Sequence, residues 1–137
     1  MSLDRFIKGH NMDYEIALSE IKAGRKRSHW IWYIFPQIHG LGMSRTSEIY
    51  SIESLDEAKE YMDNELLKNH MLEICNALLG LEESDPTKVM GCPDDLKLRS
   101  SMTLFAEATP EYDVFQKVLD KYYGGKRDKK TLEIIGL

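Results

Sequence analysis

The segment from Lys26 to Gln37, KRSHWIWYIFPQ, concentrates side chains that could bind or transform a ligand. It holds both tryptophans of the chain and a histidine, directly after a basic run. Tryptophan rings offer flat stacking surfaces, and an imidazole such as that of His29 suits general acid–base work near neutral pH. On a helix, His29, Trp32 and Tyr33 would share one side, because they lie at i, i+3 and i+4.

A second polar segment, DDLKLRSSMTL, begins at Asp94. Helical spacing would place Lys97 on the same face as Asp94, Ser100 and Ser101. Adjacent serines inside a helix are unfavourable, because their hydroxyls compete for backbone groups. They therefore either allow another helix to approach closely or bind something, while Asp94 could serve as the helix N-cap and pair with Lys97.

We expect segments 26–42 and 94–104 to meet in one polar pocket for a nucleotide-like molecule. A tryptophan would stack on the base, and the two lysines would meet phosphate. His29 is the candidate catalytic residue, acting as general acid or base. The residues predicted to contact the ligand are Lys26, Ser28, Trp30, Trp32, Tyr33, Gln37, Asp94, Lys97, Ser100 and Ser101.

Two other interpretations of the same residues stay open. The polar groups could satisfy each other in a buried network that fixes helix packing, because each costs about 1–3 kcal/mol if it is buried unpaired. The chain would then be a non-catalytic interaction or oligomerisation domain rather than a binding protein or hydrolase. The sequence does not decide whether the chain is an enzyme, and it names no cofactor.

Composition restricts the class of protein. The 137 residues fit a single domain, and the formal net charge of −5 argues against a nucleic-acid partner. The two cysteines have neither CxxC spacing nor paired histidines, which argues against a zinc site. No apolar run approaches the length of a membrane span and no secretory leader is visible, so we expect a soluble cytoplasmic protein.

Helix start and stop signals recur along the whole chain. They predict an all-α fold, one compact domain over residues 1–137, with about seven or eight helices in an irregular orthogonal array. One amphipathic stretch runs from Leu66 to Leu79 and places Leu78 inside. The predicted helix starts are Asn11, Ser28, Ser54, Asp85, Asp94, Thr109 and Asp128.

Nearly the whole chain, from about Leu3 to Leu132, resembles the bacterial family catalogued as domain of unknown function 1810. The resemblance rests on GRKRSHWIWYIFPQIHGLG, SLDEAKEY, DDLKLRSSMTLF and YYGGKRD. It implies an all-α fold and no established activity; the label "calpastatin" given to some members is a misnomer. This chain departs from the family pattern at His10, where glutamine is usual, so the pattern gives position 10 no role.

The order of the two segments is also similar to that in helical proteins that act on NAD-derived or ADP-ribose compounds. Those proteins combine a tryptophan-rich segment with a later Asp/Lys helix. A likeness in layout does not assign a function. It does suggest the class of nucleotide-like ligand to test first.

Overall fold

The computed structural model describes residues 3–42 and 44–137, and that part of the chain contains nine helices. The all-α prediction is confirmed, since the extended pairing seen there is an isolated parallel bridge between Ile38 and Ile52. None of these helices is long and apolar enough to cross a membrane. They are α1 (Asp4–Lys22), α2 (Ile31–Ile34), α3 (Arg45–Ile49), α4 (Leu55–Asp63), α5 (Glu65–Leu79), α6 (Pro86–Met90), α7 (Asp94–Ala108), α8 (Val114–Tyr123) and α9 (Lys129–Ile134).

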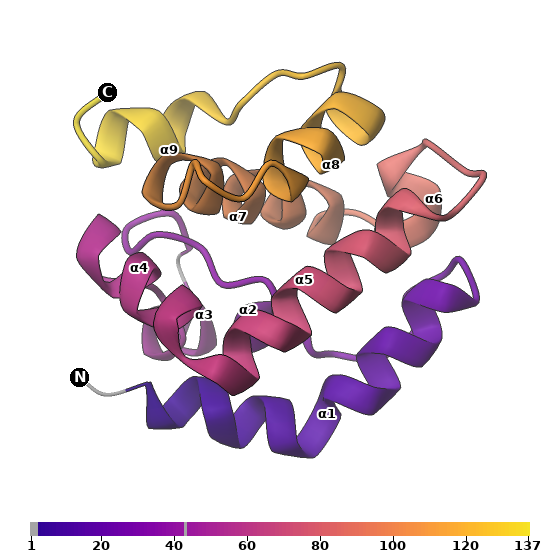
Figure 1. Ribbon diagram of the computed structural model, residues 1–137, viewed down its shortest axis with the longest axis horizontal. Coiled ribbons are helices and arrows are strands. Elements are labelled where there is room, and N and C mark those ends of the chain that lie inside the picture. Colours follow the sequence, from indigo (N-terminus) through magenta and orange to yellow (C-terminus); the bar gives the residue numbers. More distant parts are fainter. Residues whose placement is uncertain (1–2, 43) are drawn as a thin grey trace.

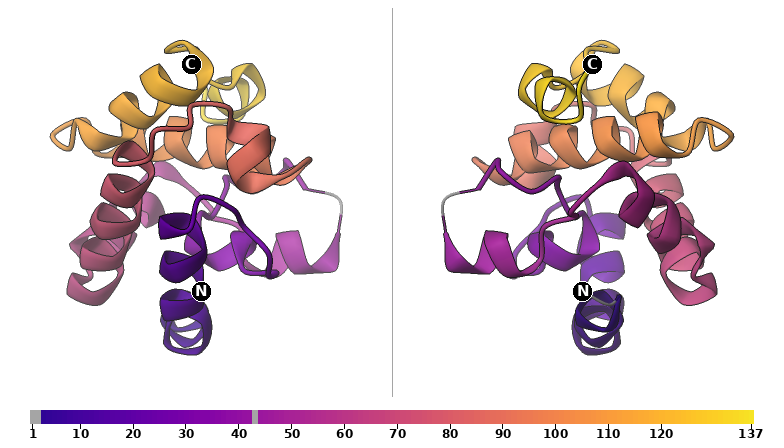
Figure 2. Two further views of the ribbon diagram at one scale, coloured as in Figure 1. Left: turned by 90° about the vertical axis from the view of Figure 1, so that its right-hand side faces the viewer. Right: turned by 90° about the vertical axis from the view of Figure 1, so that its left-hand side faces the viewer.

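The central element is α7, which packs against α2, α4, α6, α8 and α9. In the side views of Figure 2, α8 and α9 lie on one side of α7, with α1 and α2 on the other. Most α7 residues are consequently buried, polar ones included. Ser100 and Thr103 donate to carbonyl oxygens of the preceding turn, at 3.1 and 2.8 Å, and so stay satisfied within the helix.

The first helix packs along α5 and α2, as the lower half of Figure 1 shows for α1 and α5. Gly9 makes the approach to α2 possible, because a Cβ at this position would collide with the ring of Tyr33. The carbonyl of Tyr33 is thereby brought beside α1, where the next residue, His10, meets it. This contact positions the site described below.

Several helix boundaries follow the predicted signals. Ser54, Asp85 and Asp128 each accept a hydrogen bond from a backbone N–H in the first turn of α4, α6 and α9. The Leu66–Leu79 prediction corresponds to α5, in which Leu78 is fully buried. These signals are local in sequence, which is why the chain alone could reveal them.

Asn11 and Thr109 do not begin helices, and Asp94 begins α7 without capping it. Asn11 lies inside α1, which extends back to Asp4 because Phe6 is a core residue. Asp94 is not an N-cap: Pro93 occupies that position without a side-chain bond, and the Asp94 carboxylate binds lysines instead. The Thr109 hydroxyl donates to the Phe105 carbonyl at 2.8 Å and so closes α7, while α8 begins only at Val114.

The helix expected from Ser28 is confined to Ile31–Ile34. Before this helix, the carboxylate of Glu20 in α1 accepts the backbone N–H groups of Arg27 and Ser28, at 2.8 and 2.9 Å, and Trp30 occupies the N-cap position. His29 therefore precedes α2, and the predicted helical face shared by His29, Trp32 and Tyr33 does not form.

Candidate functional site

The two predicted segments do meet, where α7 passes the start of α2. Asp94 bridges two lysines, with Oδ2 2.8 Å from Lys26 Nζ and Oδ1 3.5 Å from Lys97 Nζ. Each ammonium also covers a tryptophan face, Lys26 lying 4.9 Å from the Trp30 ring centre and Lys97 5.2 Å from that of Trp32. Both indole rings thus have a charged partner from the chain itself.

Glu20, which the sequence did not single out, holds two of the predicted ligand contacts. Its carboxylate accepts from the Ser28 hydroxyl and from Trp30 Nε1, the latter at 2.9 Å. Burial raises the pKa of Glu20, but the bonds from Ser28, Arg27 and Trp30 outweigh this effect and lower the pKa to about 2. Trp30 is fully buried and Ser28 is half-buried, so in this structure the polar atoms of both side chains are engaged by Glu20.

Other side chains predicted to contact the ligand are hydrogen-bonded to other residues or buried. The Tyr33 hydroxyl donates to Asp13, and Ser100 Oγ lies 3.2 Å from Asp128 Oδ2. Ser101 is fully buried, and its hydroxyl has no hydrogen-bond partner among the described residues. Tyr33, Ser100 and Ser101 therefore do not form one ligand-facing surface with Lys97.

Between the two segments, the described residues border a small cavity. Trp32, Gln37 and Lys97 border it together with mostly apolar neighbours and Ser47, and its volume is about 10 Å³. That is room for about one water molecule. His29 is exposed and does not border the cavity, so the structure does not bring the candidate acid–base residue to Trp32 and Lys97.

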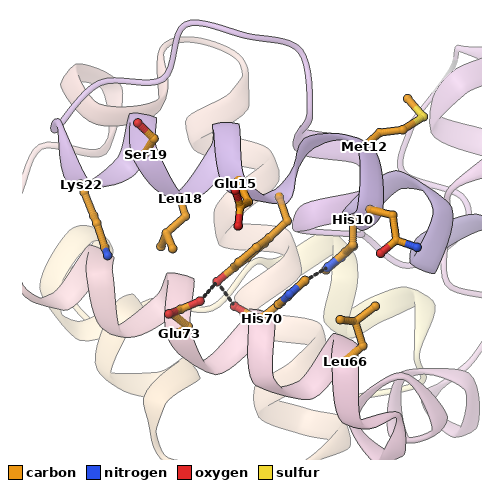
Figure 3. Close-up of a pocket in the computed structure, with 11 residues that line it drawn as sticks. His10, Met12, Glu15, Leu18, Ser19, Lys22, Leu66, His70 and Glu73 are labelled. Atoms are coloured by element: carbon orange, nitrogen blue, oxygen red, sulfur yellow. Dashed lines mark hydrogen bonds between the residues drawn. The ribbon is translucent and has the colours of Figure 1, made fainter.

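A much larger hollow lies between α1 and α5, and we call it the α1–α5 groove (Figure 3). Its volume is about 820 Å³, within the range of roughly 300–1,000 Å³ usual for small-molecule sites. The polar residues that line it include His10, Glu15, Lys22, His70 and Glu73.

Two histidines meet at the floor of the groove. His10 of α1 is 2% exposed, and its Nδ1 lies 3.0 Å from Nδ1 of His70 on α5. On its other side, His10 Nε2 lies 2.8 Å from both the Tyr33 carbonyl oxygen and the Tyr61 hydroxyl. We call these two imidazoles the histidine pair.

The hydrogen-bond partners determine the tautomer of each ring. A carbonyl oxygen can only accept, so we assign the proton of neutral His10 to Nε2, which leaves Nδ1 as an acceptor. His70 must then donate from Nδ1, and its own Nε2 carries a lone pair. Burial is the main cause that lowers the pKa of His10 to about 4, and burial also lowers the pKa of His70, so the pair is neutral at pH 7.

Tyr14 fixes the orientation of the His70 ring. The two rings are stacked, with centres 3.6 Å apart and planes 3° from parallel. The Tyr14 hydroxyl donates to Glu73 Oε1 at 2.6 Å and also lies 3.1 Å from the His70 carbonyl oxygen. His70 is thus held at one face by Tyr14 and at one edge by His10.

The sequence contains the residue pairs within each helix that line the groove, but not the way the two helices face each other. His10 and Tyr14 lie at i and i+4, and His70 and Glu73 at i and i+3, so each helix carries an aromatic or titratable pair on one face. Which faces oppose each other depends on the register of α1 against α5, which neither segment encodes alone. No group of three or more His, Cys, Asp or Glu suited to a metal occurs in the part of the chain that the structure describes.

Comparison with known proteins places the chain in a family. A solved structure, that of the conserved hypothetical protein Rv1873 from Mycobacterium tuberculosis, is similar with a TM-score of 0.96 and 41% sequence identity, covering 98% of this chain and 96% of the other. No curated protein matches the sequence. The family model described as "Protein of unknown function (DUF1810)" matches residues 1–135, so the chain belongs to the DUF1810 family.

Proposed function

We propose that this protein binds a small polar molecule in the α1–α5 groove. The observation that carries the proposal is an open groove of about 820 Å³ whose floor presents an oriented, neutral imidazole. Small-molecule sites typically combine a concave surface with a few convergent polar groups and perturbed titratable residues. The groove has all three features, whereas the cavity at Trp32 has room for about one water.

A fragment screen followed by amide chemical shifts in ¹H–¹⁵N spectra tests this proposal. We expect saturable shifts in α1 and α5 for the fragments that bind. Ser19→Trp places an indole at an exposed position that lines the groove and should abolish those shifts. Ile16→Trp is the matched control, because Ile16 is also exposed on α1 but does not line the groove.

A second candidate is a nucleotide-like ligand, NAD- or ADP-ribose-derived, at the cavity beside Trp32. The observation that favours it is the half-buried Lys97 ammonium over the Trp32 ring, a cation next to a stacking surface. Such a ligand would have to displace Lys97 and enlarge the cavity. Titration with ADP-ribose distinguishes the two candidates, because binding here would shift the indole N–H signal of Trp32, while binding in the groove would leave it unchanged.

A further inference from the structure

We infer that the ligand class of the α1–α5 groove is a small organic cation with N–H groups, held by His70 Nε2 and by the carboxylates of Glu15 and Glu73. This inference rests on the proposed function and adds the chemistry of the ligand. It follows from the free acceptor on His70, the balance of charge around it and the rigidity of the ring.

The free acceptor is His70 Nε2. The pairing of His10 and His70 through their Nδ1 atoms leaves Nε2 of His70 unprotonated in the neutral state. This nitrogen has no hydrogen-bond partner among the described residues. It is also not one of the fully buried side-chain atoms that lack a partner. It is therefore open to solvent, in a residue that lines the groove.

The charge around this nitrogen favours a cation. Figure 3 shows His70 and Glu73 projecting from α5 toward α1, from which Glu15 projects. Both carboxylates act on His70, because each raises the pKa of the imidazole against the lowering effect of burial. Lys22 also lines the groove, so its ionisable lining carries two carboxylates and one ammonium, a net negative charge.

The other titratable groups that face the pair do not change this balance. His10 from α1 is neutral because burial lowers its pKa to about 4. Tyr14 from α1 and Tyr61 from α4 stay protonated, since burial raises the pKa of both phenols. The α2 contribution is the Tyr33 carbonyl, which is uncharged. An ammonium donor is therefore complementary to His70 Nε2 in charge and in hydrogen-bond direction.

Preorganisation supports the same conclusion. Stacking on Tyr14 and the bond to His10 fix the plane of the His70 ring, and therefore the direction of its Nε2 lone pair. An acceptor that is already oriented costs a ligand little ordering entropy. An anion or a hydrogen-bond acceptor at the same place would face a lone pair and two carboxylates.

Three matched probes test this ligand class: benzylammonium, benzyl alcohol and phenylacetate, each titrated at pH 7.5 and followed by α1 and α5 amide shifts. We expect benzylammonium to bind most tightly and phenylacetate not to bind. His70→Phe retains a ring to stack on Tyr14 and should weaken benzylammonium binding about tenfold, the loss typical of one hydrogen bond to a charged group. Glu15→Gln should weaken it as well, and Glu82→Gln, at an exposed site outside the groove, should not.

A pH series adds a readout that a purely structural role for His70 would not move. Benzylammonium affinity should be constant from pH 8 to pH 7 and fall only in more acidic solution, below the ordinary imidazole pKa, because burial lowers the pKa of His70 and protonated His70 can no longer accept. The inference is overturned if benzylammonium binds no better than benzyl alcohol, or if neither His70→Phe nor Glu15→Gln weakens it. Saturable groove binding of phenylacetate instead would refute the cation class and leave the proposed function standing.

Discussion

Nδ1 of His10 lies 3.0 Å from Nδ1 of His70, a contact that joins α1 to α5 across sixty positions of the chain. Two imidazoles so close cannot both be charged without strong repulsion. This contact therefore links three properties: the shape of the groove, the packing of α1 against α5, and the protonation of both rings.

The stability of the protein should fall with acid in a window set by His10. The pKa of this residue is lowered from 6.5 to about 4 by burial, so the unfolded chain binds the proton more readily than the folded one. The contribution is complete above pH 6.5 and is lost as pH falls to about 4, by up to about 3 kcal/mol. Urea unfolding between pH 8 and pH 4 measures it. His10→Gln should flatten the profile in this window, and an unchanged slope would contradict the assignment.

Glu20 should matter more to stability than an exposed carboxylate of the same chain. Glu20→Ala removes the acceptor of Trp30 Nε1 and of two backbone N–H groups near Ser28. Leaving a buried donor unpaired costs about 1–3 kcal/mol, which a denaturation midpoint resolves. Glu82→Ala, at an exposed loop position, should change the free energy of unfolding by less than about 0.5 kcal/mol. Equal effects would show that Glu20 does not organise the 27–30 segment.

Substitutions in the two segments predicted to form a pocket should have different effects on the stability of the protein. Ser101→Ala removes a fully buried hydroxyl that has no partner among the described residues, so it should leave stability unchanged or raise it. Lys26→Met breaks the ion pair with Asp94 and should lower the melting temperature clearly. Thermal melts of both variants decide whether this region is held together by the lysine–aspartate bridge. A stable Lys26→Met protein would show that it is not.

Leu78 tests the core of the fold. The residue is fully buried on α5, as the amphipathic pattern of that segment predicts. Leu78→Ala should cost about 2–5 kcal/mol through lost burial and the cavity left behind. Leu81→Ala, at a half-exposed position just beyond the helix, should cost less in the same urea titration. The interpretation fails if the two costs are equal.

The sequence predicted the fold where signals are local and missed it where they are tertiary. The spacing from Leu66 to Leu79 predicts α5, and Asp128 predicts the start of α9, because each signal lies within one element. The helix expected at Ser28 begins only at Ile31, and the residues before it bind Glu20 of α1, a contact between separate segments that the local pattern does not contain.

The same distinction applies to the candidate site. The i, i+3 pairing of Asp94 with Lys97 is local and was predicted, whereas the second lysine at Asp94 comes from a distant segment. The segments rich in polar residues were expected to face a ligand, but Ser28 and Trp30 bind Glu20. The histidine pair depends on the register of two helices, so neither histidine could be assigned a partner from sequence.

Crystallographic fragment screening tests the central claim most directly, that the α1–α5 groove binds small molecules. Crystals soaked with a diverse fragment set should show hits concentrated between α1 and α5, with a nitrogen donor near His70 Nε2 in the best-ordered ones. Crystals of the Ser19→Trp protein should lose those hits and retain any others. Hits that cluster beside Trp32 and Lys97, with an empty α1–α5 groove, would contradict the account.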